Sequence, residues 1–288
     1  MTARDQNFFS RGVRLTYCVS LKVAAGMVFA SDSRTNAGFD QISTFRKMMV
    51  YERPGDRVMV LLSSGNLSIS QSVRELLQAQ RFAVDGNEPS TIWQASSMFD
   101  AARILGHTVR RVNDQDGPAL RAAGIDFSCT LIFGGQIKGE AMRLFLVYST
   151  GNFIEATPET CYFQIGEAKY GKPVLDRMLA PTTSLADATK CALVSIDSTL
   201  KSNLSVGLPI DLAVYKADTL RCDDLVCIDE SNPYFAMIRG SWGERLRAAF
   251  ESIDNPDWDS TEARHPLRVL GGRYEVLRKI QNPDQKLI

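Results

Sequence analysis

The chain has 288 residues with 33 basic and 33 acidic side chains, so its formal net charge is zero. This balance argues against a nucleic-acid-binding protein, and 44% hydrophobic residues argue against a disordered chain. No run approaches the roughly 18 to 20 apolar residues that span a bilayer, and residues 1–15 are too polar for a signal peptide, so we expect a cytoplasmic protein with no membrane or nucleic-acid partner.

The first part of the chain predicts β-structure. Four strands are expected, at 16–23, 27–32, 41–51 and 57–64. The first two are separated by a turn that contains Gly26, which predicts a hairpin. The fourth is a continuous apolar run that ends at Gly65, which is typical of a buried central strand.

Helical and strand patterns then alternate in blocks. Two helices are expected at 67–82 and 90–113, strands at 127–133, 141–149 and 160–165, helices at 170–180 and 184–201, and strands at 210–216 and 224–229. Pro89 and Ser90 are start signals for the second helix, and Ser184 with Asp187 resembles a capping box. Glycines 134, 135 and 151 are expected to punctuate the middle strands, and the polar tail predicts little beyond a short helix.

The order of these blocks indicates an α+β fold. Runs of strands followed by runs of helices do not give a parallel βαβ sheet. They suit two packed antiparallel sheets, each covered on its outer face by a pair of helices. No shift in composition divides residues 16–230, so this region is expected to form one domain.

Cysteine and histidine are informative by their number and spacing. The six cysteines include no CxxC pair, and several, such as Cys129 and Cys227, lie in apolar runs, so buried free thiols are expected. The two histidines, His107 and His265, nearly exclude a histidine-rich metal site. A hydrolase built on this chain is therefore expected to work without histidine and without a metal.

Several motifs, taken in order, resemble the proteasome β-subunit family, which has the N-terminal-nucleophile hydrolase fold. The matching residues are TYCVS (16–20), FASDSRT (29–35), Lys47 and SSG (63–65). The segments SDSRTNAG (31–38), QISTFRKM (41–48) and SNLSVGLPIDL (202–212) are most similar to its bacterial Anbu, or ancestral β-subunit, branch. The resemblance covers about residues 16–230. It implies a four-layer αββα sandwich.

The resemblance implies roles for four residues. A threonine hydroxyl needs a base, and the α-amino group of an N-terminal threonine can serve because its reference pKa is about 7.7 to 8.0. A nearby cation lowers that pKa further. The nucleophile would be Thr16, the cation Lys47, and the carboxylate that orients it Asp32. Gly65 would offer its backbone N–H to the oxyanion.

Each of these residues also has an ordinary structural interpretation. A buried Asp–Lys pair is often purely structural, Gly65 suits a helix N-cap, and Thr16 is common strand composition. The order and context of the motif favour the functional interpretation for Asp32, Lys47 and Gly65. They favour it only partly for Thr16, because Leu15 precedes it.

The position of Thr16 within the chain sets a condition on activity. With Leu15 attached, the Thr16 nitrogen is an amide and cannot act as a base. Either residues 1–15 are removed or the enzyme is inactive. Proteasome propeptides are usually cut after glycine. The resemblance to the Anbu branch implies a different start, because its members begin Met-Thr without a propeptide. We therefore hypothesise that Leu15 marks the true start, as a leucine-type codon read as initiator methionine and trimmed before Thr16.

Two positions, Glu167 and Ser202, depart from the proteasome pattern of residues that support the threonine. A serine usually follows the glycine of the strand at 160–165, but here Glu167 follows Gly166. The aspartate that usually precedes the Ser-Val-Gly element corresponds to Ser202, ahead of Ser205. These residues support the threonine amine in the family, so the departures weaken any transfer of proteasome-level activity. Glu167 is either a substitute carboxylate or a solvated surface residue.

The family places its substrate-binding edge after Asp32, at Arg34 and Asn36. A peptide would add there as an extra strand, opposite the residues around Gly65.

The resulting functional prediction is a threonine-type peptidase that acts through an acyl-enzyme intermediate and needs no cofactor. The predicted domains are an N-terminal extension (1–15), the proteasome-like domain (16–232) and a C-terminal extension (233–288). The resemblance implies a homo-oligomeric ring or spiral, and any ATPase would be a separate partner because the chain has no phosphate loop. The alternatives are a non-catalytic structural or regulatory subunit and an amidase that acts on small amides.

Overall fold

The computed structural model describes residues 16–36, 42–79, 90–256, 263–270 and 273–278. The chain divides into two compact units, Met1–Arg239 and Gly240–Ile288, and each is described by itself. The domain boundaries expected from the sequence, after residues 15 and 232, stay a prediction. None of the described helices combines the length and the apolar character that crossing a membrane requires.

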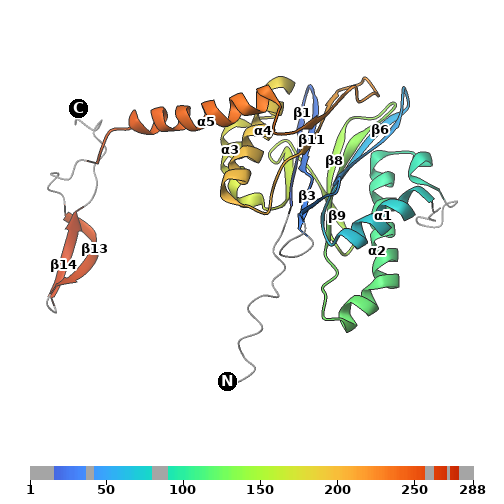
Figure 1. Ribbon diagram of the computed structural model, residues 1–288, viewed down its shortest axis with the longest axis horizontal. Helices are drawn as coiled ribbons and strands as arrows, with labels where there is room; N and C mark the ends of the chain where they lie inside the picture. Colours follow the sequence, from blue (N-terminus) through green and yellow to red (C-terminus); the bar gives the residue numbers. More distant parts are fainter. Residues whose placement is uncertain (1–15, 37–41, 80–89, 257–262, 271–272, 279–288) are drawn as a thin grey trace. The chain divides into compact units, whose positions relative to one another are not determined.

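Two five-stranded antiparallel sheets form the centre of the first unit (Figure 1). The first has the order β10-β1-β2-β11-β12, with β1 (Tyr17–Val23), β2 (Gly26–Asp32), β10 (Tyr162–Gly166), β11 (Ile210–Lys216) and β12 (Asp224–Ile228). The second has the order β5-β6-β7-β8-β9, with β5 (Met48–Arg53), β6 (Arg57–Gly65), β7 (Cys129–Ile137), β8 (Arg143–Val147) and β9 (Phe153–Glu155). The hairpin β1–β2 confirms the prediction for residues 16–32.

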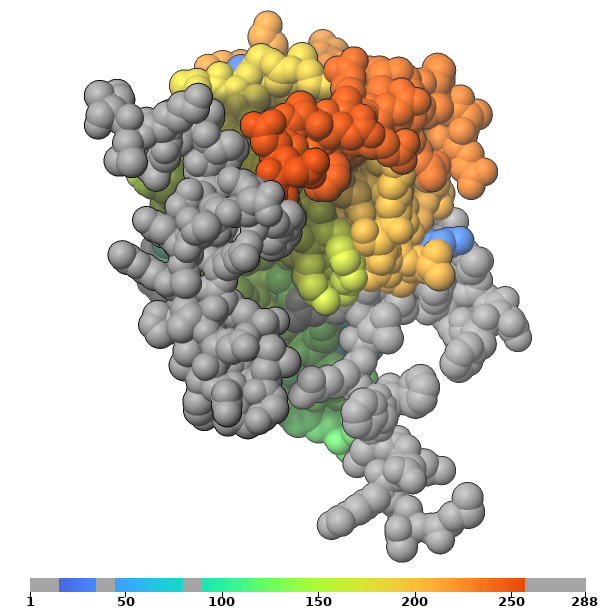
Figure 2. Space-filling model, turned by 90° about the vertical axis from the view of Figure 1, so that its left-hand side faces the viewer, coloured from blue at the N-terminus to red at the C-terminus, as the bar shows by residue number. Residues whose placement is uncertain are grey.

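Helix pairs cover the outer faces of both sheets. The helices are α1 (Leu67–Ala79), α2 (Met98–Ala122), α3 (Ala168–Met178), α4 (Leu185–Ser202) and α5 (Pro233–Glu251). The apolar faces of α1 and α2 share a core with the second sheet, and α4 packs on β1 and β2. The α3–α4 layer forms part of the molecular surface, and its yellow to light-orange residues are visible in Figure 2. The four-layer αββα architecture predicted from the sequence is thereby confirmed.

A second core lies between the two sheets. Cys18, Met27 and Phe29 of the first sheet pack with Val60 and Ile132 of the second. Their strands are apolar on both faces because helices cover the outer side, which is why the pattern of 57–64 is continuous rather than alternating.

The glycines of β7 do not interrupt it, contrary to the prediction. Gly134 and Gly135 lie inside the strand and pair with β6 and β8. A Cβ atom at Gly134 would lie 2.7 Å from the Met27 methyl group of the opposite sheet, so glycine permits the close packing of the layers there.

The predicted strand 41–51 is wrong in one respect that matters for the site. The chain forms β4 (Ile42–Thr44), which pairs with β3 (Arg34–Asn36), and then leaves the strand conformation before β5 begins at Met48. The break, Phe45–Lys47, turns Lys47 inward.

Several other boundaries differ from the prediction. Helix α2 begins after the N-cap Ser97, whose side chain accepts from the Asp100 N–H, and not at Ser90. A short 3-10 helix, Ile92–Gln94, precedes it, and the short strand β9 has no counterpart in the prediction. The tail is more regular than expected, because α5 is followed in the second unit by the antiparallel pair β13 (Ala263–Leu270) and β14 (Arg273–Arg278).

All six cysteines are free thiols, as expected. Five of them are buried, but Cys227 is exposed because β12 is an edge strand of its sheet.

Candidate active site

Thr16 lies immediately before β1 and is 6% exposed. Its carbonyl oxygen accepts a hydrogen bond of 2.8 Å from the backbone N–H of Glu167. The neighbouring residue Tyr17 pairs with Gly166 at the end of β10. The backbone of β10 and of the start of α3 therefore holds Thr16 at one end of the first sheet.

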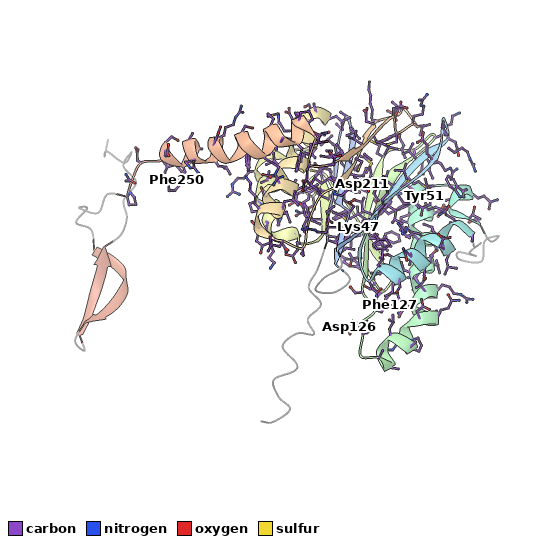
Figure 3. The ribbon with its side chains drawn as sticks, viewed as in Figure 1. Lys47, Tyr51, Asp126, Phe127, Asp211 and Phe250 are labelled. Carbon is purple, nitrogen blue, oxygen red and sulfur yellow. The ribbon has the colours of Figure 1, made fainter. Side chains whose placement is uncertain are left out.

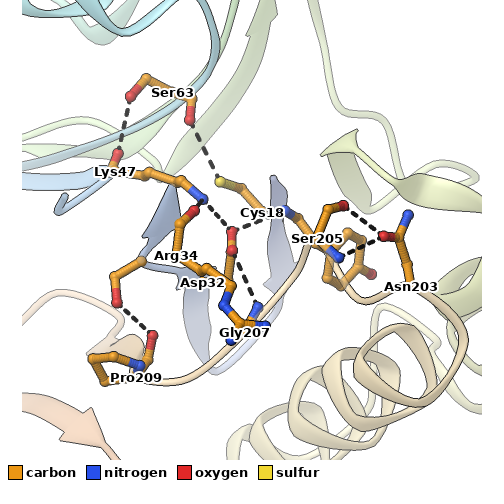
Figure 4. A network of polar contacts seen from close by, with 11 residues as sticks. Cys18, Asp32, Arg34, Lys47, Ser63, Asn203, Ser205, Gly207 and Pro209 are labelled. Atoms are coloured by element: carbon orange, nitrogen blue, oxygen red, sulfur yellow. Dashed lines mark hydrogen bonds and ion pairs between the residues drawn. The ribbon is translucent and has the colours of Figure 1, made fainter. Parts of the chain in front are cut away.

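The Asp32 carboxylate links the start of β1 to the second sheet. Asp32 ends β2 and is 0% exposed. Its Oδ1 accepts from the Tyr17 N–H at 2.9 Å and from Lys47 Nζ at 2.7 Å, and its Oδ2 accepts from the Gly207 N–H at 3.5 Å (Figure 4). Burial raises the pKa of Asp32, whereas the Lys47 ammonium and the two amides oppose that rise. One oxygen thus joins the residue after Thr16 to Lys47.

Lys47 reaches Asp32 because the chain is not a strand at this point. Its ammonium also donates to the Arg34 carbonyl at 2.6 Å, and its own carbonyl accepts from the Ser63 N–H at 3.0 Å. Lys47 is 6% exposed. The ammonium is therefore held inside the protein by Asp32 and Arg34, while the Lys47 backbone is held by β6.

Gly65 ends β6, and α1 begins two residues later, as the sequence predicted. Because backbone groups of alternate strand residues point to the same side, the Gly65 N–H points to the side on which the Ser63 N–H binds Lys47. Gly65 has φ +115°, and a Cβ atom there would lie 2.3 Å from the Ser128 carbonyl oxygen. Only glycine fits this position, at the end of the strand whose Ser63 N–H binds the Lys47 carbonyl.

A buried tyrosine network, not foreseen from the sequence, anchors β1 from the helix side. The Tyr17 hydroxyl lies 2.5 Å from Ser195 Oγ of α4 and accepts from Gln164 Nε2 of β10 at 2.5 Å. Tyr17 is 0% exposed, and burial raises the pKa of its hydroxyl. The three residues are far apart in sequence, so no local signal could have connected them.

Replacing Tyr17 with phenylalanine is expected to lower the free energy of unfolding by about 1–3 kcal/mol, because the buried Ser195 hydroxyl and the partly buried Gln164 amide lose their partner. The ring stays, so no cavity forms. Urea denaturation measures the loss. Tyr148→Phe, at a partly exposed position, is the control and should change the unfolding free energy by no more than about 0.5 kcal/mol; equal effects for both variants would contradict an anchoring role for the hydroxyl.

The supporting residues proposed from the sequence lie in different places. Ser205 is 8% exposed, and its N–H and Oγ bind Asn203 Oδ1 at 2.9 Å and 2.5 Å (Figure 4). Ser202 is exposed at the end of α4, and the next residue, Asn203, provides the amide oxygen that binds Ser205. Glu167 is partly buried, and its backbone rather than its carboxylate contacts Thr16.

The two residues assigned to the substrate-binding edge both belong to β3. Arg34 Nη1 donates to the Leu204 carbonyl at 3.0 Å, and its side chain packs over Gly207. The Asn36 side chain lies outside the described part of the structure. The structure therefore ties Arg34 to the loop before β11, and the assignment of Asn36 stays a prediction.

Comparisons with known proteins identify the family. No family model matches the chain, and no curated protein does. A solved structure of Anbu (ancestral beta-subunit) from Yersinia bercovieri is 48% identical, with a TM-score of 0.77, and the match covers 84% of this chain and 100% of that one. The chain belongs to the Anbu family.

Other solved Anbu structures agree. A structure described as the helical assembly of the Anbu complex from Pseudomonas aeruginosa is 45% identical, with a TM-score of 0.78, and the match covers 85% of this chain and all of that one. A Gly-1 mutant of Anbu from Hyphomicrobium sp. strain MC1 is 44% identical over 84% of this chain and 99% of its own, with a TM-score of 0.77. The Anbu fold is thus matched over almost the whole length of each of these relatives.

Proposed function

We propose that the protein is a threonine-type peptidase in which Thr16 is the nucleophile. The observation that carries the proposal is the shared Asp32 Oδ1, which binds the Tyr17 N–H and the Lys47 ammonium together. A cation is thereby linked, through Asp32, to the residue that follows Thr16. Burying a carboxylate and an ammonium together costs desolvation free energy, and such buried, charge-paired groups concentrate at functional sites.

The proposed reaction uses one threonine twice. The Thr16 hydroxyl attacks the peptide carbonyl carbon while its proton passes to the free Thr16 amine. The tetrahedral intermediate collapses, the peptide C–N bond breaks, and the protonated amine returns the proton to the leaving nitrogen. Water then attacks the resulting ester, with the amine again as the base, and releases the acid and Thr16. The Lys47 ammonium disfavours a second positive charge and so keeps the amine neutral.

Gly65 is proposed to stabilise the oxyanion. The negative charge develops on the carbonyl oxygen of the substrate, and a backbone N–H at the start of a helix is a suitable donor for it. We assign the substrate edge to Arg34 and Asn36 of β3 and propose that a peptide pairs there as an added strand. Ser205 and Glu167 are proposed to support the Thr16 backbone from either side.

Activity also requires that residues 1–15 are removed, because only then does Thr16 carry a free amine. We further propose that the active form is a homo-oligomeric ring or spiral in the cytoplasm. The Anbu of Pseudomonas aeruginosa, whose structure is described as a helical assembly, supports this proposal.

The decisive experiment is intact-mass analysis of protein expressed from its native gene, with and without an epoxyketone or lactone probe. We expect a chain that begins at Thr16 and gains one probe mass on that residue. Thr16→Ala is expected to abolish labelling and to lower peptide turnover at least about 10³-fold, whereas Thr35→Ala, on β3, should still label. A mature chain that keeps residues 1–15 and does not react would instead favour a non-catalytic subunit. Labelling of Thr16 with turnover of small acyl amides but not peptides would favour an amidase.

A further inference from the structure

A second buried carboxylate, Asp211, lies near the candidate site without a role in it. Asp211 belongs to β11 and is 6% exposed. Its cross-strand neighbours are Ser31 of β2 and Cys227 of β12. Figure 3 shows Asp211 and Lys47 in the central part of the sandwich. Cys18 of β1 also pairs with Ser31, so Cys18, Ser31 and Asp211 lie side by side across three neighbouring strands.

Stability does not explain this carboxylate. Its Oδ2 has no hydrogen-bond partner among the described residues, and neither has the hydroxyl of the adjacent Ser31. Among the described residues it forms an ion pair with Arg46 Nη1, at 3.4 Å, and the Arg46 side chain is 72% exposed. Burial raises the pKa of Asp211, and the positive charge of Arg46 offsets only part of that rise. A buried charge with so distant and so solvated a partner costs more free energy than the pair returns.

The partner of Asp211 is informative, because Arg46 immediately precedes Lys47. Both lie in the break between β4 and β5. The Phe45 N–H donates to the Ser33 carbonyl at 2.9 Å, and the Arg46 carbonyl accepts from Arg74 Nη1 at 3.0 Å. The ion pair adds a side-chain tie from this break to β11. It acts on the residue next to Lys47, from a position on β11 that pairs with Ser31, the residue before Asp32.

We propose that Asp211 is a positioning residue that, through Arg46, holds the break between β4 and β5 so that Lys47 stays paired with Asp32. Its meaning for catalysis rests on the proposed function, whereas the positioning of Lys47 does not. This buried carboxylate is thereby explained by the segment it holds, which is the one that carries Lys47. Loss of either partner frees the break, and the Lys47 ammonium then spends more time away from Asp32.

The test measures how fast an amine-directed acetylating reagent modifies Lys47 in the full-length protein, followed by peptide mass spectrometry. Lys47 reacts slowly in the native protein because it is buried and paired. Asp211→Asn and Arg46→Gln are each expected to raise its rate about fivefold, and the double variant no further. Arg46→Lys, which keeps the charge, is expected to preserve the slow rate. Glu155→Gln breaks an ion pair with Arg143 elsewhere on the second sheet and is the control that leaves it unchanged.

Two outcomes would overturn the proposal. One is a Lys47 rate that stays at the native value in both single variants. The other is a parallel rise at Lys22 of β1, which would indicate a general loosening rather than a local one. Arg46 is exposed and Asp211→Asn keeps its shape, so both variants are expected to fold, and thermal denaturation verifies this. Probe labelling at Thr16 is measured in parallel. If native Thr16 does not react, the proposed function fails while the Lys47 rates still decide the positioning role.

Discussion

Replacing Lys47 with alanine is expected to lower the free energy of unfolding by about 3–5 kcal/mol and to slow the reaction of Thr16 with a covalent probe about 10²- to 10⁴-fold. Asp32 would remain fully buried with two backbone N–H donors and no counter-charge. The Thr16 amine would also lose the neighbouring cation that keeps it neutral. Urea denaturation measures the first effect and the time course of intact mass measures the second.

Lys190→Ala is the matched control for this variant. Lys190 forms an ion pair with Asp187 at 2.6 Å, a distance close to that of the Lys47–Asp32 pair. The side chains of Lys190 and Asp187 are, however, each 56% exposed. Water therefore replaces the lost contact, and we expect a change below about 1 kcal/mol and an unchanged probe rate. Comparable losses in the two variants would show that burial of the Lys47–Asp32 pair has no special weight.

Replacing Gly166 with alanine is expected to disturb Thr16 more directly. Gly166 has φ +84°, and a Cβ atom there would lie 1.9 Å from the Thr16 carbonyl oxygen and 2.6 Å from its carbonyl carbon. Both of these atoms belong to the backbone, so no side-chain rotation relieves the clash. We expect a loss of at least about 3 kcal/mol in the free energy of unfolding. The rate of probe labelling should fall with it, because Thr16 itself must move.

Gly55→Ala separates the two costs that Gly166→Ala combines. Gly55 has φ +75°, but a Cβ atom there would have no neighbour within 4 Å. It therefore carries only the backbone strain, about 1–2 kcal/mol, without the clash. Thermal or urea denaturation of both variants gives the difference. If Gly55→Ala were as destabilising as Gly166→Ala, close contact with Thr16 would not be the reason that glycine stands at position 166.

Much of the fold could be predicted because the local patterns and the tertiary structure agree. The apolar run 57–64 is the buried strand β6, and Gly65 ends it. Ser184 caps α4 by accepting from the Asp187 N–H at 3.1 Å, as the capping pattern indicated. Where residue propensity, the spacing of apolar residues and the end signals favour the same element, the tertiary contacts stabilise that element rather than a different one.

The prediction failed where tertiary contacts decide the conformation. Residues 41–51 have the composition of a strand, but the Lys47 ammonium gains two acceptors only if the strand breaks before Met48. Helix α2 starts at its cap Ser97 rather than at Pro89, because a short 3-10 helix occupies the chain between. The break before Met48 has no signal within a window of sequence, whereas Ser97 with Asp100 repeats the Ser-x-x-Asp pattern seen at Ser184 and could have marked the start of α2.

The candidate site shows the same division. Asp32, Lys47 and Gly65 were singled out by a resemblance in their order, and the structure brings Asp32 and Lys47 into contact. The Tyr17 network and the pair of Arg46 with Asp211 join residues more than 140 positions apart, which no spacing rule connects. Their discovery needs the register of the strands rather than the sequence.

The split origin of the site has a consequence for biosynthesis. Thr16 directly precedes β1 and Asp32 ends β2 of the first sheet, while Lys47 directly precedes β5 and Gly65 ends β6 of the second. A partly folded subunit in which either layer is missing holds no complete set of reacting groups. Under the proposed function, completion of the tertiary structure would thus act as an internal safeguard, because a nascent chain could not cut its neighbours before the two sheets had packed together.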